Sequence, residues 1–188
     1  MKITIGGYPG SGKTTVANVI AEKLKLKHVY MGAIRRKLAR DKGMTLDELN
    51  KLGETEDWTD KEPDKILEKL GKEEDNFLAE GRVAFYFIPD SIKILMKVDL
   101  KEGAKRIFKD QHEKGQAKER NESVADDIEG AAENLQKRID SDIMRYEKYY
   151  GIDCYDEKHY DLVIDTTDIT PEEAIQQTLD FINKKANL

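Results

Sequence analysis

The sequence predicts an α/β protein with a central five-stranded parallel sheet and helices on both faces, which makes three layers. Short apolar stretches alternate along the chain with longer segments whose apolar residues recur at helical spacing. The chain has 188 residues, of which 38% are hydrophobic and 37% charged, as expected for one globular domain with a charged surface. Strands that alternate with helices favour a parallel sheet, which binds ligands beyond the carboxyl ends of its strands.

Five stretches have the length and composition of buried strands, namely residues 2–6, 28–31, 76–80, 92–98 and 160–165. Helical spacing predicts a helix over about 12–26, directly after the first strand. Another begins near Gly32, and a third follows the strand that ends at 98. At the end of the chain, Thr170 followed by Pro171 and two acids predicts a closing helix that runs to about Lys184.

Two segments interrupt this alternation. Between the second and third strands lie about 30 mostly helical residues, in which Thr45 and Glu48 have the spacing of a capping box. Asp60 is predicted to cap a further helix that runs toward Leu70. The other segment, residues 112–122, is polar and has no apolar periodicity, so we expect a mobile flap there.

Composition excludes several classes of function. The formal net charge of -6 argues against a nucleic acid polymer as the main partner, which would require a basic surface. No apolar run is long enough to span a membrane. The chain has one cysteine, Cys154, so no internal disulfide can form, and Met1 leads directly into the first predicted strand without room for a signal peptide. We therefore expect a cytoplasmic protein.

The turn at residues 7–14 matches the phosphate-binding pattern G-x-x-x-x-G-K-[ST] and lies between a predicted strand and a predicted helix, as a P-loop does. Its glycines allow backbone N–H groups to surround a phosphate, and the helix that follows directs its positive end at the anion. Lys13 adds a full charge, and the Thr14 hydroxyl is suited to hold Mg²⁺. A turn without a ligand would need neither residue. The residues that we assign to binding the nucleotide are Gly7, Gly10, Ser11, Gly12, Lys13, Thr14 and Thr15.

A P-loop occurs in kinases, GTPases and ATP-driven motors, so other residues must decide between them. The nearest match to the guanine-reading motif Asn-Lys-x-Asp is residues 183–186, which lack the acid and lie on the last helix. This argues against a GTPase. A motor core needs a longer chain and a strand that ends in an acid, of which residues 77–80 are a short and ambiguous version.

The chain has eight arginines, and arginine is suited to bidentate contacts with phosphate. Arg82 follows the third predicted strand. Arg35 and Arg36 lie at the start of a helix, where their side chains point about 100° apart, and we select Arg36. The candidates on the long helix after the flap are Arg138, Asp142 and Arg145. Their spacing of i, i+4 and i+7 puts them on one helix face over about 10 Å, enough to span two phosphates. The alternative is a solvated ladder of salt bridges.

Four stretches together resemble one family: residues 7–14, 31–36, 80–82 and 138–153. On these motifs the chain resembles the nucleoside monophosphate kinases, and most closely the short cytidylate kinases typical of archaea, nearly from end to end. One departure is Ala33, which stands where the family has an acid. We expect this to weaken the organisation of the metal rather than the fold.

The resemblance implies an ATP-dependent kinase that phosphorylates CMP or dCMP, with Mg²⁺ and ATP bound at Lys13 and Thr14. Arg36 and Arg82 would bind the acceptor monophosphate, and Asp142 would lie near the sugar hydroxyls. The implied catalytic residues are Lys13, Arg82, Arg138 and Arg145, and the implied substrate-binding residues are Arg36, Arg82, Arg138, Asp142 and Arg145. The implied organisation is a single domain with a core of residues 1–31, 73–109 and 126–188, a monophosphate-binding arm of residues 32–72 and a lid of residues 110–125.

Substrate choice stays open at this stage. A related kinase for AMP, UMP or a non-nucleotide hydroxyl such as shikimate would share most of these motifs, and an ATP-dependent switch protein would share the P-loop. Four charged residues of the arm lie where the family reads the base: Asp60, Lys61, Asp64 and Lys65. We interpret them as a charged helix face. We expect a monomer.

Overall fold

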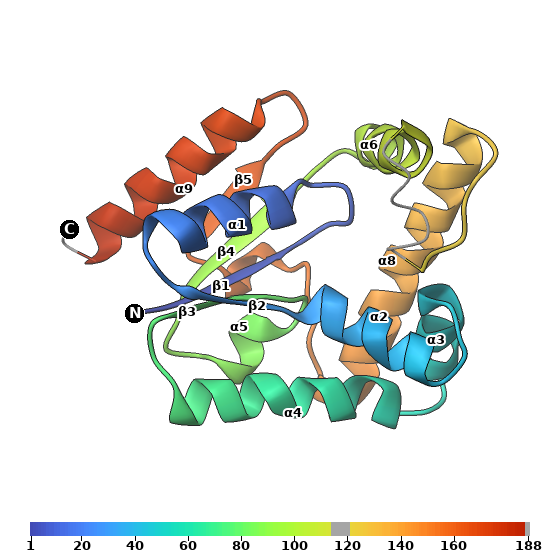
Figure 1. Cartoon of the computed structure of the whole chain (residues 1–188), viewed down its shortest axis with the longest axis horizontal. Coiled ribbons are helices and arrows are strands. Elements are labelled where there is room, and N and C mark those ends of the chain that lie inside the picture. The colour runs from blue at the N-terminus through green and yellow to red at the C-terminus, as the bar shows by residue number, and fades with distance from the viewer. Residues whose placement is uncertain (114–120, 187–188) are drawn as a thin grey trace.

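The computed structural model describes residues 1–113 and 121–186, and its centre is a five-stranded sheet in which all neighbouring strands are parallel (Figure 1). The strands are β1 (Lys2–Gly7), β2 (Lys27–Tyr30), β3 (Phe77–Glu80), β4 (Ile92–Lys97) and β5 (Leu162–Asp165). Their order across the sheet is β2-β3-β1-β4-β5. The predicted fold class and all five predicted strands are confirmed, with ends that differ by at most two residues.

The described helices are α1 (Lys13–Lys23), α2 (Met31–Asp41), α3 (Leu46–Gly53), α4 (Trp58–Glu73), α5 (Ala84–Phe87), α6 (Leu100–Glu113), α8 (Ile128–Tyr150) and α9 (Pro171–Ala186), with a 3-10 turn at Glu157–His159. The closing helix begins at the predicted proline and is capped by Thr170 and Glu173. The sequence did not predict α5, which is a single turn after β3.

Helices cover both faces of the sheet. In Figure 1, α1 and α9 lie above the strands and α4 and α5 lie below them. Successive side chains of a strand point to opposite faces of the sheet, and each face has its own core. Ile5 packs in one core with Ile20 and Ile182, and Phe77 packs in the other core with Leu70. Full burial of an apolar side chain of this size contributes about 1.5–3 kcal/mol to folding. The two cores hold the carboxyl ends of the strands in place.

Helices α2, α3 and α4 form the inserted helical segment and have a small core of their own, with Ala39, Leu46 and Leu49. The predicted capping box is confirmed: Thr45 Oγ1 accepts from the Glu48 amide at 3.2 Å, and Glu48 Oε2 accepts from the Thr45 amide at 2.7 Å. The prediction for Asp60 is wrong. It lies in the first turn of α4, fully buried, where ion pairs with arginines replace a capping bond.

The predicted flap falls only partly within the described residues, since 114–120 lie outside them. The residues that follow this gap contact the start of α3. The Leu46 amide donates to the Asn121 carbonyl at 2.8 Å, and the Ser123 amide donates to Asp47 Oδ2 at 2.6 Å. The end of the flap is therefore attached to the inserted helices. Within 1–113 and 121–186, no helix combines the length and apolar character needed to cross a membrane.

We expect Asp60→Ala to lower the free energy of unfolding by about 3–5 kcal/mol, because it leaves the fully buried guanidinium of Arg145 without one of its carboxylates. Urea denaturation measures this change. The matched control is Lys72→Ala, which removes an exposed ion pair with Glu68 on the same helix and should change stability much less. Equal losses in the two variants would contradict the assignment.

Candidate active site

A cavity of about 690 Å³ opens beyond the carboxyl ends of the strands, where the fold class predicts a ligand. Its wall is built from segments far apart in the sequence, namely residues 9–16, 30–33, 80–83 and 169–171. Further lining comes from Thr166 and from helices α2, α3, α4, α6, α8 and α9. All the nucleotide-binding residues predicted after Gly7 line this cavity, together with Arg36, Arg82, Arg138 and Asp142.

The turn after β1 has the backbone of a phosphate cradle. Gly10 and Gly12 adopt φ angles of 77° and 76°, which favour glycine, and a Cβ on Gly10 would come within 2.6 Å of the Gly103 carbonyl oxygen. Gly12 is the N-cap residue of α1 and supplies no side-chain capping bond, so the helix end can bind an anion. The Ser11 hydroxyl oxygen is buried and has no hydrogen-bond partner among the described residues.

Lys13 lies at the start of α1, and its Nζ donates to the Tyr8 carbonyl at 3.1 Å. Burial and the neighbouring Arg82 guanidinium lower the pKa of Lys13 well below its ordinary value. The nearby carboxylates of Glu80 and Asp142 oppose this shift but do not offset it. A bound phosphate would supply further negative charge and favour the protonated lysine.

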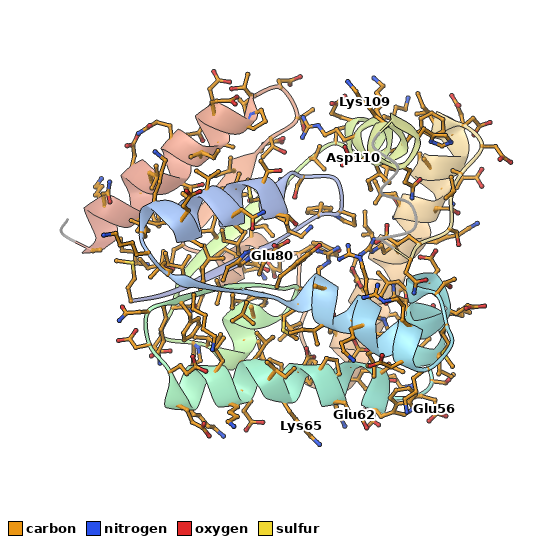
Figure 2. All side chains as sticks on the ribbon, in the orientation of Figure 1. Glu56, Glu62, Lys65, Glu80, Lys109 and Asp110 are labelled. Atoms are coloured by element: carbon orange, nitrogen blue, oxygen red, sulfur yellow. The ribbon has the colours of Figure 1, made fainter. Side chains whose placement is uncertain are left out.

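Thr14 contacts a carboxylate that sequence reasoning left out of the site. Its Oγ1 donates to Glu80 Oε1 at 2.7 Å, and Figure 2 shows Glu80 close below α1. The second oxygen, Glu80 Oε2, is buried without a hydrogen-bond partner in the described part of the chain, and His28 Nε2 lies 3.4 Å from it. The signal in the sequence is an acid at the end of a short apolar strand, residues 77–80.

A hydroxyl and a carboxylate are oxygen ligands of the kind that Mg²⁺ prefers, so Thr14 and Glu80 fit this ion. The described residues contain no group of three or more His, Cys, Asp or Glu side chains that could bind a metal on their own. Magnesium would therefore need further oxygen ligands from a bound phosphate.

Three of the six arginines that line the cavity, Arg36, Arg82 and Arg138, were selected from the sequence and come from separate elements. Arg82 donates from Nε to Asp142 Oδ2 at 2.8 Å and from NH1 to the Gly7 carbonyl at 2.6 Å. Arg138 NH1 donates to Glu122 Oε1 at 3.0 Å, and the same oxygen lies 3.6 Å from Arg36 NH2. A carboxylate that lies between two arginines marks a position where a phosphate could bind.

Asp142 is the acidic centre of this arginine group. It also accepts a hydrogen bond from the Tyr155 hydroxyl at 2.9 Å. Burial alone would raise the pKa of Asp142, but Arg82, Arg145 and Arg138 hold it well below its ordinary value. The side chain is therefore ionised at neutral pH and keeps Arg82 in position.

The structure places Arg145 differently from the prediction. Its side chain is fully buried and does not line the cavity, because it pairs with Asp142 Oδ1 at 2.5 Å and with Asp60. The helical spacing was right, but α3 packs against this part of α8 and covers it. The alternative of a solvated ladder is wrong too, since Asp142 and Arg145 are both buried.

The inserted helices contribute polar side chains that sequence reasoning missed. Arg35, which was not selected from the sequence, lines the cavity. Its guanidinium group donates to Asp60 Oδ1 at 2.6 Å and to Asn50 Oδ1 at 2.9 Å. Asp64 also lines the cavity and is buried, so the predicted charged face does not include Asp60 or Asp64. Lys61 and Lys65 are exposed as predicted, and Figure 2 shows Lys65 pointing away from the molecule.

Comparison with known proteins identifies the family. A family profile described as an AAA domain matches residues 6–129. The chain is 38% identical to a cytidylate kinase of Methanopyrus kandleri, over 88% of this chain and 84% of that protein. It is 35% identical to a cytidylate kinase of Methanobrevibacter smithii, over 92% of each, and 35% identical to one of Sulfolobus acidocaldarius, over 98% and 96%.

Solved structures share the fold at lower sequence identity. An uncharacterized protein from Eubacterium ventriosum has a TM-score of 0.67 at 19% identity, over 97% of this chain and 98% of that one. A shikimate kinase from Acinetobacter baumannii has a TM-score of 0.60 at 17% identity, over 98% and 93%. At such identities the likeness shows the fold alone. The sequence relatives, by contrast, share more than a third of their aligned residues over most of both chains, and the chain therefore belongs to the cytidylate kinase family.

Proposed function

We propose that this protein transfers the γ-phosphoryl group of MgATP to CMP or dCMP, giving ADP and CDP or dCDP. The observation that carries the proposal is that one cavity is lined both by a P-loop and by arginines from other elements, among them Arg36, Arg82 and Arg138, so two phosphate groups could be bound together. A monomeric protein that acts in the cytoplasm is the matching expectation. Relatives with the name cytidylate kinase support the choice of acceptor.

The donor half of the site consists of the P-loop with Glu80. Backbone amides of residues 10–14 and the Lys13 ammonium would bind the ATP phosphates. Thr14 and Glu80 would hold Mg²⁺, which when bound offsets charge on those phosphates. Ala33 lines the cavity where the family has an acid, and Glu80 would be the carboxylate that holds the ion beside Thr14.

The acceptor half consists of Arg36, Arg82 and Arg138, which we propose bind the monophosphate. The phosphate would take the place of the Glu122 carboxylate between Arg36 and Arg138. Asp142 would face the sugar hydroxyls, and Arg145 would position Asp142 without touching the substrate. No covalent intermediate is needed, because catalysis follows from holding two anionic groups in line and offsetting their repulsion. Residues 32–72 would move as the arm and 110–125 as the lid.

Two other functions would give different results in the assay described below. One is a kinase for AMP, UMP or a non-nucleotide hydroxyl such as shikimate. The other is a switch protein that binds ATP but has no acceptor. A switch needs no second phosphate site, so the presence of Arg36, Arg82 and Arg138 in the cavity wall favours a kinase.

An assay of ADP release distinguishes these readings. With MgATP held constant, we expect CMP and dCMP to stimulate ADP release strongly, and UMP, AMP, shikimate and water to stimulate it little. A preference for AMP or shikimate would reassign the kinase. The absence of stimulation by any acceptor would support the switch.

Arg82→Ala should lower kcat with CMP by roughly 10²- to 10⁴-fold, because Arg82 offsets charge at the reacting phosphates and is held there by Asp142. Steady-state kinetics measure the change, and circular dichroism checks the fold. Lys72→Ala serves as the control and should keep full activity. An Arg82→Ala protein that folds and retains wild-type turnover would remove this residue from the mechanism.

Substitutions of Arg138 and Arg145 should have different effects, although both residues lie on α8. Arg138→Met should raise KM for CMP at least tenfold with a small change in stability, because Arg138 faces the cavity. Arg145→Met should lower the free energy of unfolding by about 3–5 kcal/mol, because it leaves Asp60 and Asp142 buried without this partner. Urea denaturation and steady-state kinetics on both variants check these effects. A stability loss confined to Arg138→Met, with a raised KM confined to Arg145→Met, would contradict the buried position of Arg145.

A further inference from the structure

A buried tyrosine that does not line the cavity contacts both halves of the site. Tyr155 belongs to the segment between α8 and β5, and its side chain is 5% exposed. It packs in the core that contains Phe77. Because Tyr155 is absent from the cavity wall, it can affect a bound ligand only through the residues that it contacts.

The Tyr155 hydroxyl and the Arg82 guanidinium share one oxygen atom. The hydroxyl donates to Asp142 Oδ2 at 2.9 Å, and Arg82 Nε donates to the same oxygen at 2.8 Å. Burial raises the pKa of Tyr155 well above its ordinary value, and Asp142 adds to this shift while Arg82 opposes it. The hydroxyl therefore keeps its proton at neutral pH. Since Asp142 Oδ1 pairs with Arg145, contacts on both oxygens hold this carboxylate in one orientation.

The Tyr155 ring contacts the P-loop and Arg82 as well. Its centroid lies 4.3 Å from that of the Tyr8 ring, with 30° between the two planes, and Arg82 Cζ lies 5.7 Å from the Tyr155 centroid. Both distances are typical of attractive aromatic and cation–π contacts. Tyr8 is the residue whose carbonyl accepts from Lys13 Nζ. One ring therefore contacts both the residue that binds Lys13 and the arginine across the cavity.

The orientation of Arg82 decides where its remaining donors point. In the described part of the chain, two of its five N–H groups donate to Asp142 and to the Gly7 carbonyl. The side chain also lines the cavity, so other N–H groups can reach a phosphate. Catalytic groups must lie within about 0.5 Å of their productive position, and this depends on the residues behind them.

We propose that Tyr155 is a positioning residue for phosphoryl transfer, which holds Arg82 in a fixed place relative to the P-loop. Its hydroxyl fixes the Asp142 oxygen that binds Arg82, and its ring packs against Tyr8 and the guanidinium group. The inference rests on the proposed function, because it requires that Arg82 acts on the reacting phosphates. Tyr155 itself touches neither nucleotide.

Tyr155→Phe tests the hydroxyl, because it keeps the ring. We expect kcat with CMP to fall about tenfold and KM for MgATP to change by less than about twofold, since Asp142 loses a donor while the contact with Tyr8 is kept. Steady-state kinetics measure both. The matched control is Tyr149→Phe, which removes a hydroxyl that donates to the Gly53 carbonyl at 2.6 Å and should leave kcat unchanged.

A double-mutant cycle separates positioning from a structural role. In the Arg82→Ala background, Tyr155→Phe should cause no further loss of kcat, because the hydroxyl acts through Arg82. A hydroxyl that only supports the fold would lower kcat by the same factor in both backgrounds. Urea denaturation of the four proteins checks that each is folded.

Tyr155→Leu tests the ring. We expect it to weaken MgADP binding by at least about threefold, because Tyr8 loses its stacking partner and the carbonyl that binds Lys13 is held less firmly. Calorimetry measures this affinity without turnover, and Tyr155→Phe should bind MgADP as the wild type does. A folded Tyr155→Leu protein with wild-type affinity would contradict the role of the ring. If this variant does not fold, Tyr155→Phe and the cycle still decide the role of the hydroxyl.

The outcomes distinguish the inference from the proposed function. If the wild-type enzyme phosphorylates CMP but Tyr155→Phe keeps full kcat, or lowers it equally with and without Arg82, the inference is overturned and the proposed function stands. If the wild-type enzyme has no turnover with CMP, the proposed function fails and the inference fails with it.

Discussion

The structure depends on neutralising the positive charges that surround one cavity. A lysine and several arginines converge there, and buried ions are tolerated only when carboxylates pair with them. Asp142 lies between Arg82 and Arg145, and Glu80 accepts from the P-loop threonine. Asp142 is thus held by arginines, and Glu80 is held by the P-loop.

These ion pairs are of two kinds. The pairs of Arg145 with Asp60 and Asp142 are fully buried and belong to the fold. The contacts of Glu122 with Arg36 and Arg138 lie in the cavity wall, where an incoming phosphate would compete for the same guanidinium groups. Glu122 is the last residue of the predicted flap, and its neighbours Asn121 and Ser123 contact the start of α3. A phosphate that displaced Glu122 would therefore act on a segment that is attached to the inserted helices.

Asp60 connects the inserted helices to the rest of the molecule. It lies on α4 and pairs with Arg35 of α2 and Arg145 of α8. Asp64 follows one turn later on the same helix and reaches the cavity. The network of ion pairs that holds the inserted helices therefore lies directly beside the cavity wall.

Local patterns were sufficient for the strands, the phosphate turn and the closing helix, because each depends on spacing within a few residues. They also selected Arg36, Arg82 and Arg138, all of which line the cavity. Which part of a helix face is covered by another element depends on the tertiary structure alone. Arg145 is buried and Arg138 is not, although the two are seven residues apart on α8. Likewise, Glu80 meets Thr14 across 66 residues and Arg145 meets Asp60 across 85, and no periodicity in a single segment records contacts of that range.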